Sequence, residues 1–249
     1  MRPASHSPDQ PPLRGGPPGL ESNLVWTALV HEPGTGVAIV SHDGVTLWAN
    51  PTAVRIFHGP DHTPETIIGR PWTEFFPAEW IAERLALLRR IQETQQPALL
   101  RTIWRGFQHV SWIHPIPGDE RDGGDAEPLP DRFLVITRRV EGDVFEIAGK
   151  GTTADVRESD VANLGALDVL TSRELEVLSL IGQGMSIKEI ASILGRSVKT
   201  IENHRTSIGE KLKVDDRVHL AEIARRAGLT VLDAERRRVE SGPGPRAVP

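Results

Sequence analysis

The sequence predicts an α+β domain followed by an all-α domain, and three observations lead to this fold class. The first part of the chain reads as two strands, several helices and three further strands, a segregated order that is typical of α+β folds. Beyond residue 167 the apolar residues follow helical spacing throughout. All six Trp and all six Phe lie between residues 26 and 145, so the aromatic side chains belong to the first domain alone.

The first elements begin after a segment of low complexity. Residues 1–19 contain six Pro and three Gly, which predicts a disordered tail. Residues 21–33 predict a short helix. Two apolar runs then flank Asp43-Gly44, and this pattern predicts a β-hairpin.

Helices follow the hairpin. Asn50 as N-cap and Pro51 at the first helical position predict a helix that continues to about residue 58. Residues 63–77 predict short helical turns that Gly and Pro interrupt, and residues 78–96 predict a longer helix.

Three further strands complete the first domain. Residues 98–107, 109–117 and 132–140 are rich in β-branched and aromatic residues, which favours strands. An acidic Gly/Pro-rich loop at residues 118–131 separates the last two. Together with the hairpin, these strands predict a sheet of five strands.

Four helices account for the second domain. Capping boxes at Thr171 with Glu174 and at Ser186 with Glu189 mark two helix starts. A third helix begins at Ser197, and a fourth begins near residue 215 or 216. The predicted boundaries are a disordered tail (1–19), a first domain (20–148), a linker (149–166), a four-helix domain (167–232) and a flexible tail (233–249).

The segment Gly195-Arg196-Ser197 joins two helices into a helix-turn-helix. The major groove of B-DNA admits one α-helix, and the preceding helix can support it from behind. The same pattern is also compatible with a structural α-hairpin whose polar face is merely solvated.

If this helix pair binds DNA, the outward residues of the second helix are expected to contact bases and phosphates. Asn pairs with adenine in a bidentate way and Glu accepts from cytosine N4, so the expected base-reading residues are Glu202, Asn203 and Thr206. The expected phosphate contacts are Ser186, Lys188, Ser197, Lys199, Thr200, Arg205 and Lys211.

Charge and composition limit the function classes. Residues 1–165 hold 15 Lys/Arg against 22 Asp/Glu, whereas residues 166–249 hold 14 against 12. The second domain has no aromatic residue to stack on unpaired bases, so duplex is the expected nucleic acid. The chain has no Cys, which excludes disulfides and thiolate metal sites and suits a reducing cytoplasm. No apolar run reaches the roughly 20 residues of a membrane helix.

The stretch "LTSRELEVLSLIGQGMSIKEIASILGRSVKTIENHRTSIGEKLKVDDRVHLAEIA" resembles the C-terminal DNA-binding domains of the LuxR/GerE family. The resemblance implies a four-helix domain that binds duplex DNA, reads bases through Glu202, Asn203 and Thr206, and dimerises through its fourth helix. This sequence departs from the family pattern at Ile187, where Asn is frequent, and at Glu202, where Lys is common. These departures leave the DNA sequence that is read open.

The phrase "GVTLWANPTAVRIFH…IIGRPWTEFFP" and the order of elements in residues 20–148 resemble a PAS domain. The resemblance implies a five-stranded antiparallel sheet with helices over one face, which senses ligands, light or redox state, or mediates dimerisation. The aromatic side chains that either build its core or line a sensor pocket are Trp48, Trp72, Trp104 and Trp112.

No cofactor or metal ion is predicted. Photochemistry through a cysteinyl-flavin bond is excluded because the chain has no Cys, and an unidentified small-molecule ligand of the PAS-like domain stays open. His58 and His62 have ligand-like spacing, but Gly59-Pro60 breaks any helix between them.

These features predict a cytoplasmic transcription regulator that couples a sensor domain to sequence-specific binding of double-stranded DNA, and no enzyme motif is visible. The expected assembly is a homodimer without membrane contact, and RNA polymerase is a further candidate partner. The alternatives are a sigma-factor-like protein and an interaction module whose helical domain holds a protein partner. A small-molecule enzyme built on the PAS-like pocket has no residue set to support it.

Overall fold

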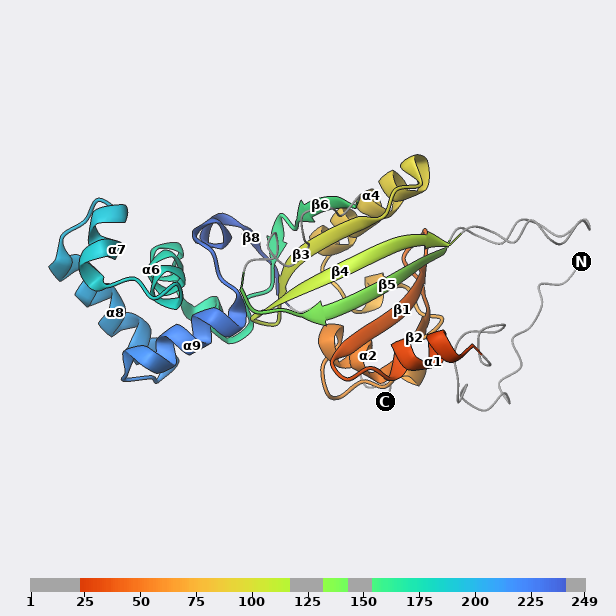
Figure 1. Cartoon of the computed structure of the whole chain (residues 1–249), viewed down its shortest axis with the longest axis horizontal. Coiled ribbons are helices and arrows are strands. Elements are labelled where there is room, and N and C mark those ends of the chain that lie inside the picture. The colour runs from red at the N-terminus through yellow and green to blue at the C-terminus, as the bar shows by residue number, and fades with distance from the viewer. Residues whose placement is uncertain (1–22, 117–131, 143–153, 241–249) are drawn as a thin grey trace, which may run out of the picture.

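The computed structural model describes residues 23–116, 132–142 and 154–240. Its elements form two units that follow one another along the long axis of the molecule (Figure 1). One is a sheet with helices, called the sensor domain below after the role that the sequence predicts for it, and the other is a group of four helices. The predicted disordered tail (1–19) and acidic loop (118–131) lie outside the described residues.

The sensor domain is built on a six-stranded sheet with the order β2-β1-β5-β4-β3-β6. The first five strands pair antiparallel, which confirms the predicted five-stranded antiparallel sheet, whereas β6 pairs parallel with β3. The first strand, β1, pairs with β5, the last of these five, so helices lie in the sequence between two strands that are neighbours in the sheet. The bounds are Thr35–Ser41 (β1), Thr46–Ala49 (β2), Ala98–Trp104 (β3), Phe107–Ile116 (β4), Arg132–Arg139 (β5) and Asp155–Glu158 (β6).

Helical segments cover one face of this sheet, and one helix lies on the other face. The covering segments run in chain order between β2 and β3, as predicted, and α4 is the long helix among them. The bounds are Leu24–His31 (α1), Pro51–Phe57 (α2), Pro64–Ile67 (α3), Trp72–Glu74 (the 3-10 helix η1) and Ala78–Thr94 (α4).

Asn50 fastens α2 to the sheet, beyond its predicted role as N-cap. Its Oδ1 accepts from the backbone N–H groups of Ala53 (2.8 Å) and Val37 (3.0 Å). Its Nδ2 donates to the carbonyls of Thr35 and Val30, both at 2.9 Å. One buried amide therefore satisfies backbone groups of β1, of α2 and of the end of α1, which fixes where the helices start.

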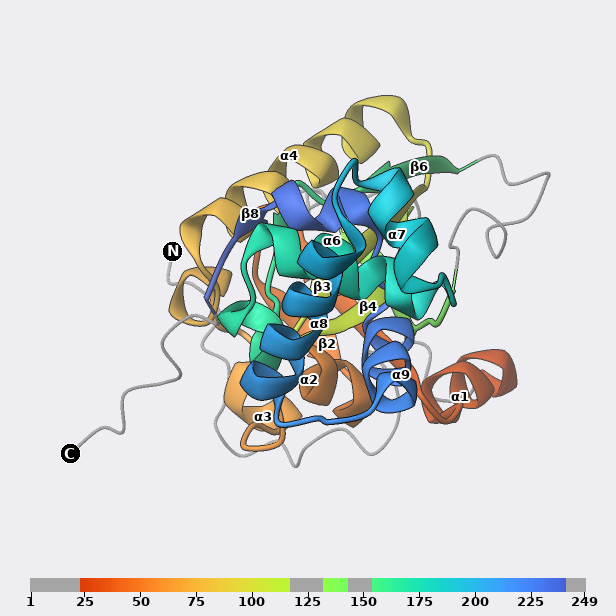
Figure 2. The same ribbon diagram turned by 90° about the vertical axis from the view of Figure 1, so that its left-hand side faces the viewer.

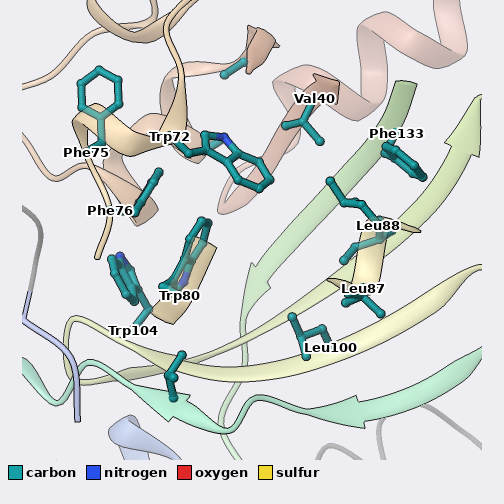
Figure 3. Packing of buried hydrophobic residues seen from close by; sticks show 14 of the residues in the cluster. Val40, Trp72, Phe75, Phe76, Trp80, Leu87, Leu88, Leu100, Trp104 and Phe133 are labelled. Carbon is teal, nitrogen blue, oxygen red and sulfur yellow. The ribbon is translucent and has the colours of Figure 1, made fainter. Parts of the chain in front are cut away.

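Side chains alternate between the two faces of each strand, as the pleat requires. On β3, Leu100 and Trp104 face the helices and belong to the main core, whereas Leu99 faces the opposite side. Trp80 of α4 lies beside Trp104, and Phe76 stacks on Trp80 with ring centroids 4.2 Å apart (Figure 3). An aromatic cluster thus fills the space between α4 and the sheet.

The opposite face of the sheet is covered at one end by α1. Trp26 of this helix is buried against Val37 and Ile39 of β1, and its ring lies 5.3 Å from that of Trp48. The two tryptophans therefore form a separate small core on the face away from α4.

The described part of the predicted linker is not a free connection. Residues 155–158 form β6 beside β3, and Val161–Ala162 form a second short strand, β7. Val161 reaches into the main core of the sensor domain. The expectation of a linker at 149–166 is therefore wrong for these residues, because β3 is an open sheet edge whose backbone groups a passing strand satisfies.

The second unit contains the four predicted helices, preceded by the 3-10 helix Gly165–Val169 (η2). Both predicted capping boxes are present, at Thr171 with Glu174 and at Ser186 with Glu189, and Asp216 caps the fourth helix. Apolar side chains from all four helices share one buried cluster. The bounds are Ser172–Gly182 (α6), Ile187–Ile193 (α7), Val198–Leu212 (α8) and Arg217–Ala227 (α9).

The chain beyond α9 returns to the sensor domain. Val231–Glu235 form a 3-10 helix (η3), and Arg237–Arg238 form β8, which pairs with β7. The prediction of a flexible tail at 233–249 is therefore wrong for residues 233–240, and residues 241–249 lie outside the described residues. The sequence alone shows this segment as Arg-rich and gives no sign of its order, because its few apolar residues contact residues that are far away along the chain.

Gly182 lets α6 approach α9 closely, and we expect Gly182→Ala to destabilise the protein. An added Cβ would lie 2.6 Å from Cβ of Ala224, so one helix must shift. Overpacking of this kind costs about 1–3 kcal/mol, which outweighs the gain of roughly 1 kcal/mol that alanine normally brings to a helix. Urea denaturation measures the change, with the exposed Ser192→Ala on α7 as control. A more stable Gly182→Ala protein would contradict the tight α6–α9 packing.

Candidate DNA interface and sensor cavity

Helices α7 and α8 form the helix-turn-helix, and they lie at the end of the molecule farthest from the sheet (Figure 1). Gly195 ends α7 with a φ of +60°, a left-handed conformation that glycine adopts without strain. The N–H of Arg196 donates to the carbonyl of Ala191 at 2.9 Å, which completes a Schellman-type helix end. Ser197 then caps α8 by accepting from the N–H of Thr200 at 3.0 Å. The tight turn sets the angle between the two helices.

The three expected base-reading residues all lie on the exposed side of α8. Figure 2 views this end of the molecule directly, with α8 in front of the sheet. The side chain of Asn203 is exposed and makes no hydrogen bond to another described residue, so its amide is available to a partner. The carboxylate of Glu202 lies 3.7 Å from Nζ of Lys199, and the hydroxyl of Thr206 donates to the Glu202 carbonyl at 3.0 Å. The inner side of the same helix is apolar, with Ile201 and Ile208 fully buried.

Five of the expected phosphate contacts surround the start of α7 and of α8. The side chains of Lys188 and Lys199 are exposed. The three hydroxyl residues stand at the helix N-termini, where Ser186 and Ser197 are the caps and Thr200 lies one turn into α8. Free N–H groups at a helix start favour an anion, so these positions are compatible with phosphate binding.

The remaining two expected phosphate contacts are engaged inside the domain. Nη2 of Arg205 donates to the carbonyl of Asp215 at 3.3 Å, which ties α8 to the turn before α9. Nζ of Lys211 lies 2.6 Å from Oε2 of Glu174 on α6. Both cations stabilise the position of α8 in the DNA-free protein, and their contact with phosphate stays a prediction.

Glu174 is the carboxylate that holds α8 on its support. Its side chain is 5% exposed and accepts hydrogen bonds from Lys211, from Ser207 (2.7 Å) and from the N–H of Thr171 (2.7 Å). Burial raises the pKa of Glu174, but these hydrogen bonds outweigh burial and lower its pKa to about 2. The sequence identifies Glu174 only as a capping residue, because its second role joins residues 37 positions apart.

The sensor domain encloses a cavity of about 80 Å³ between the sheet and the helices. Its wall is almost entirely apolar, with Arg84, Thr102, Ser111 and His58 among its polar side chains. The lining residues are Ala38, Val40, Thr46, Ala49, Ala53, Phe57, His58, Ile67, Trp72, Phe76, Trp80, Arg84, Leu88, Leu100, Thr102, Ser111, Ile113 and Val135.

Of the four tryptophans expected in the core or at a pocket, Trp72 lines this cavity. Trp104 is buried beside it in the main core, with an exposed fraction of 1%. Trp48 and Trp112 face the other side of the sheet, because strand alternation directs them away from the helices. Trp48, Trp104 and Trp112 therefore fit the core alternative, and Trp80 of α4 lines the cavity at a place that the sequence analysis did not assign.

Arg84 is the charged residue at the cavity. It lies on the buried side of α4, and its Nη2 donates to the hydroxyl of Thr102 at 3.2 Å. Its Nη1 pairs with Glu83 and lies 3.4 Å from the hydroxyl of Ser159. Burial lowers the pKa of Arg84, and the charge of Glu83 opposes that shift. The signal in the sequence is an arginine within the apolar row that includes Trp80 and Leu88.

His58 lies at the end of α2 on the cavity wall. Burial, followed by the charges of His62 and Arg105, lowers its pKa to about 4, so this ring is neutral at pH 7. Its ring centroid lies 5.7 Å from that of His62, which brings together the pair that Gly59-Pro60 separates in the sequence. Within the described ranges, no group of three or more His, Cys, Asp or Glu is arranged to hold a metal ion.

The C-terminal helices match a known domain family. Residues 168–224 match the GerE family, described as bacterial regulatory proteins of the luxR family. The chain therefore carries a luxR-family helix-turn-helix domain, the DNA-binding part of transcription regulators, as its sequence predicts. Among the described residues, none of the helices is long and apolar enough to cross a membrane.

Individual relatives share this domain. The chain is 49% identical over 57 residues to the transcriptional regulatory protein UhpA of Escherichia coli (strain K12), which covers 23% of this chain and 29% of UhpA. It is 40% identical over 105 residues to the oxygen regulatory protein NreC of Staphylococcus carnosus, covering 38% of this chain and 48% of NreC. The chain thus spans less than half the length of either relative.

Among solved structures, the chain is similar to VqmA of Vibrio cholerae in its complex with ligand and DNA. The sequences are 20% identical, the TM-score is 0.44, and the match covers 84% of this chain and 90% of VqmA.

Proposed function

We propose that this protein is a transcription regulator that binds specific sequences of double-stranded DNA through α8. The observation that carries the proposal is the row Glu202, Asn203 and Thr206 on the exposed side of α8, at the outer end of the molecule. A helix of this kind fits the major groove, where amide and carboxylate side chains distinguish base pairs by hydrogen bonding. The luxR-family match over residues 168–224 supports the same function.

Each side chain has a role in this proposal. Asn203 pairs with the N6 and N7 atoms of adenine, and Glu202 accepts from N4 of cytosine once it leaves Lys199. Thr206 contacts a neighbouring base edge. Lys188 and Lys199 bind phosphates together with the helix starts at Ser186, Ser197 and Thr200, while Arg205 and Lys211 keep α8 in place and add positive charge near the backbone.

The sensor domain would control this binding. The PAS-like domain precedes the DNA-binding domain and would sense a signal, and the apolar cavity beside Trp72 and Arg84 is its candidate ligand site. As a homodimer the protein would present two α8 helices to half-sites about one DNA turn apart, roughly 34 Å. Dimer contacts would come from α9 or from the sensor domain.

Replacing Asn203 with alanine is expected to weaken specific binding about ten-fold or more, because a good bidentate base contact contributes about 1–3 kcal/mol. Fluorescence anisotropy of the full chain on a duplex from its own upstream region measures the change, with unrelated duplex as competitor. Gln96→Ala removes an exposed amide from the sensor domain and serves as the matched control.

A salt series separates base reading from phosphate contact. Lys199→Ala should reduce the slope of log K against log salt by about one, whereas Asn203→Ala should leave this slope unchanged. Equal affinity of the full chain for the specific and the unrelated duplex would contradict base reading. Absence of binding at low salt would favour a protein partner for the helical domain instead.

A further inference from the structure

A buried ion pair joins the sensor sheet to the segment that follows α9. Arg101 of β3 and Asp233 of η3 form a bidentate contact, with Nη1–Oδ1 at 2.8 Å and Nη2–Oδ2 at 2.7 Å. The exposed fractions of the two side chains are 3% and 0%. A bidentate pair with this burial holds two surfaces in one geometry, because separating them would leave two buried charges with fewer partners.

The other donors of Arg101 reach the end of α9. Its Nη2 also donates to the carbonyl of Gly228 at 2.8 Å, and its Nε donates to Oε1 of Gln108 on β4. Gly228 has a φ of +61°, and a Cβ at this position would lie 2.6 Å from Cβ of Gln108. Polar and steric contacts around the guanidinium of Arg101 thus hold the four-helix domain against the sheet. We call Arg101, Gln108, Gly228 and Asp233 the latch.

Arg236 connects the latch to β6. Its Nε donates to Oδ1 of Asp233 at 2.7 Å, and its Nη2 pairs with Glu158. Glu158 also lies 3.6 Å from Nη1 of Arg101. The carboxylate of Glu158 therefore faces both arginines of this interface.

Ser159, the residue after Glu158, contacts side chains of α4 at the cavity. Ser159 is fully buried, donates from its hydroxyl to Oε2 of Glu83 at 2.7 Å, and lies 3.4 Å from Nη1 of Arg84. The N–H of Asp160 donates to Oε1 of Glu83 at 2.6 Å. Adjacent residues of one segment thus contact the charged group of the cavity and the charged group of the latch.

A second pair of neighbours repeats this arrangement on β3. Thr102 faces the cavity and accepts from Arg84, whereas Arg101 faces the latch on the other side of the strand. Arg84 contacts β3 at Thr102 and the residue directly after β6 at Ser159. On each segment the adjacent residue, Arg101 or Glu158, takes part in the ion pairs around the latch.

We propose that the latch fixes the four-helix domain on the sensor sheet, and that Thr102 and Ser159 transmit the position of Arg84 to it. Arg84 lines this cavity of about 80 Å³, and a ligand that displaces Arg84 breaks its hydrogen bonds to Thr102 on β3 and to Ser159 directly after β6. Occupancy of the cavity then alters the orientation of the DNA-reading helices. The inference rests on the proposed function for its effect on DNA binding, whereas the contacts that couple the two domains do not involve DNA.

The absence of cysteine makes a direct test practicable, because two introduced cysteines are the sole labelling sites. Spin labels at the exposed positions Glu93→Cys on α4 and Ser192→Cys on α7 report the distance between the two domains by pulsed electron resonance. The labelled full chain, mixed with an excess of unlabelled chain so that a dimer carries labels on one protomer, is expected to give one narrow distance maximum. Asp233→Asn should replace it with a broad distribution, and Arg70→Met, whose ion pair with Glu74 stays within the sensor domain, should not.

The coupling is tested by changing the cavity end alone. Arg84→Met should shift or broaden the distance maximum, and the same substitution in the Ser159→Ala background should do so less. Thr102→Val removes a hydroxyl that accepts from Arg84 and serves as a milder second variant if circular dichroism shows that Arg84→Met does not fold.

A narrow, unshifted maximum in Asp233→Asn would overturn the latch. An unchanged maximum in both Arg84→Met and Thr102→Val, or an equal effect with and without Ser159, would overturn the coupling. These distances are measured without DNA, so they stand or fall separately from the effect of Asn203→Ala on DNA affinity.

Discussion

Arg101→Met is expected to lower the free energy of unfolding by about 3–5 kcal/mol, the usual cost of breaking a buried ion pair by removing one partner. The substitution leaves the carboxylate of Asp233 with an exposed fraction of 0% and without its bidentate partner. It also leaves the carbonyl of Gly228 without the donor that Arg101 provides. Urea denaturation of the full chain measures the loss.

Two further variants separate charge from packing. The double variant Arg101→Met with Asp233→Asn should recover part of the loss, because the buried carboxylate that Arg101 neutralised is then removed as well, and the amide in its place can keep a hydrogen bond to Thr230. Arg90→Met is the matched control, since Arg90 pairs with Asp155 at the surface and such pairs contribute about 1 kcal/mol or less. Equal losses of unfolding free energy in Arg101→Met and Arg90→Met would contradict the expectation that the buried ion pair contributes more to stability than the exposed one.

Glu174→Gln is expected to destabilise the four-helix domain by about 3 kcal/mol at pH 7, since one pKa unit corresponds to about 1.4 kcal/mol. The folded state lowers the pKa of this carboxyl from 4.5 to about 2, through Lys211, Thr171 and Ser207. Its contribution is therefore fully present above pH 4.5 and is lost as the pH falls towards 2. Because Ser207 and Lys211 lie on α8, this helix becomes less firmly held on α6 together with this loss.

The pH dependence of the difference between two proteins isolates this group from the other carboxylates. The stability gap between the wild-type chain and Glu174→Gln should be large at pH 7 and smaller at pH 3. Glu189→Gln is the matched control, because Glu189 closes the equivalent capping box of α7 at an exposed position. A gap that stays constant between pH 7 and pH 3 would contradict the assigned role of Glu174.

Local signals explain why much of the fold could be predicted from the sequence. The caps at Asn50, Thr171, Ser186 and Asp216 lie within a few residues of the N–H groups they satisfy, so the pattern is complete within one turn of helix. Likewise, the outward row on α8 follows from helical spacing alone, and the structure places all three side chains on the exposed side.

The features that escaped prediction depend on contacts between distant residues. Arg101 and Asp233 are 132 positions apart, and nothing in the alternation of β3 distinguishes an arginine that is buried from one that is exposed. The strand β6 contains polar residues, and it is held by the open edge of β3 rather than by its own pattern. For a tryptophan on a strand, the alternation of side chains decides which face of the sheet it occupies. The faces of Trp48 and Trp112 became clear only from the pairing register of the sheet.

The return of the chain after α9 has a consequence for the order in which the protein is completed during synthesis. Val239 is buried in the main core of the sensor domain, and its carbonyl accepts from Nδ2 of Asn163 at 2.9 Å. The ribosome makes this residue after all four helices of the second domain. Although domains generally fold from the N-terminus as they emerge, the core of the first domain here acquires the side chain of Val239 only after helices α6 to α9 have been made.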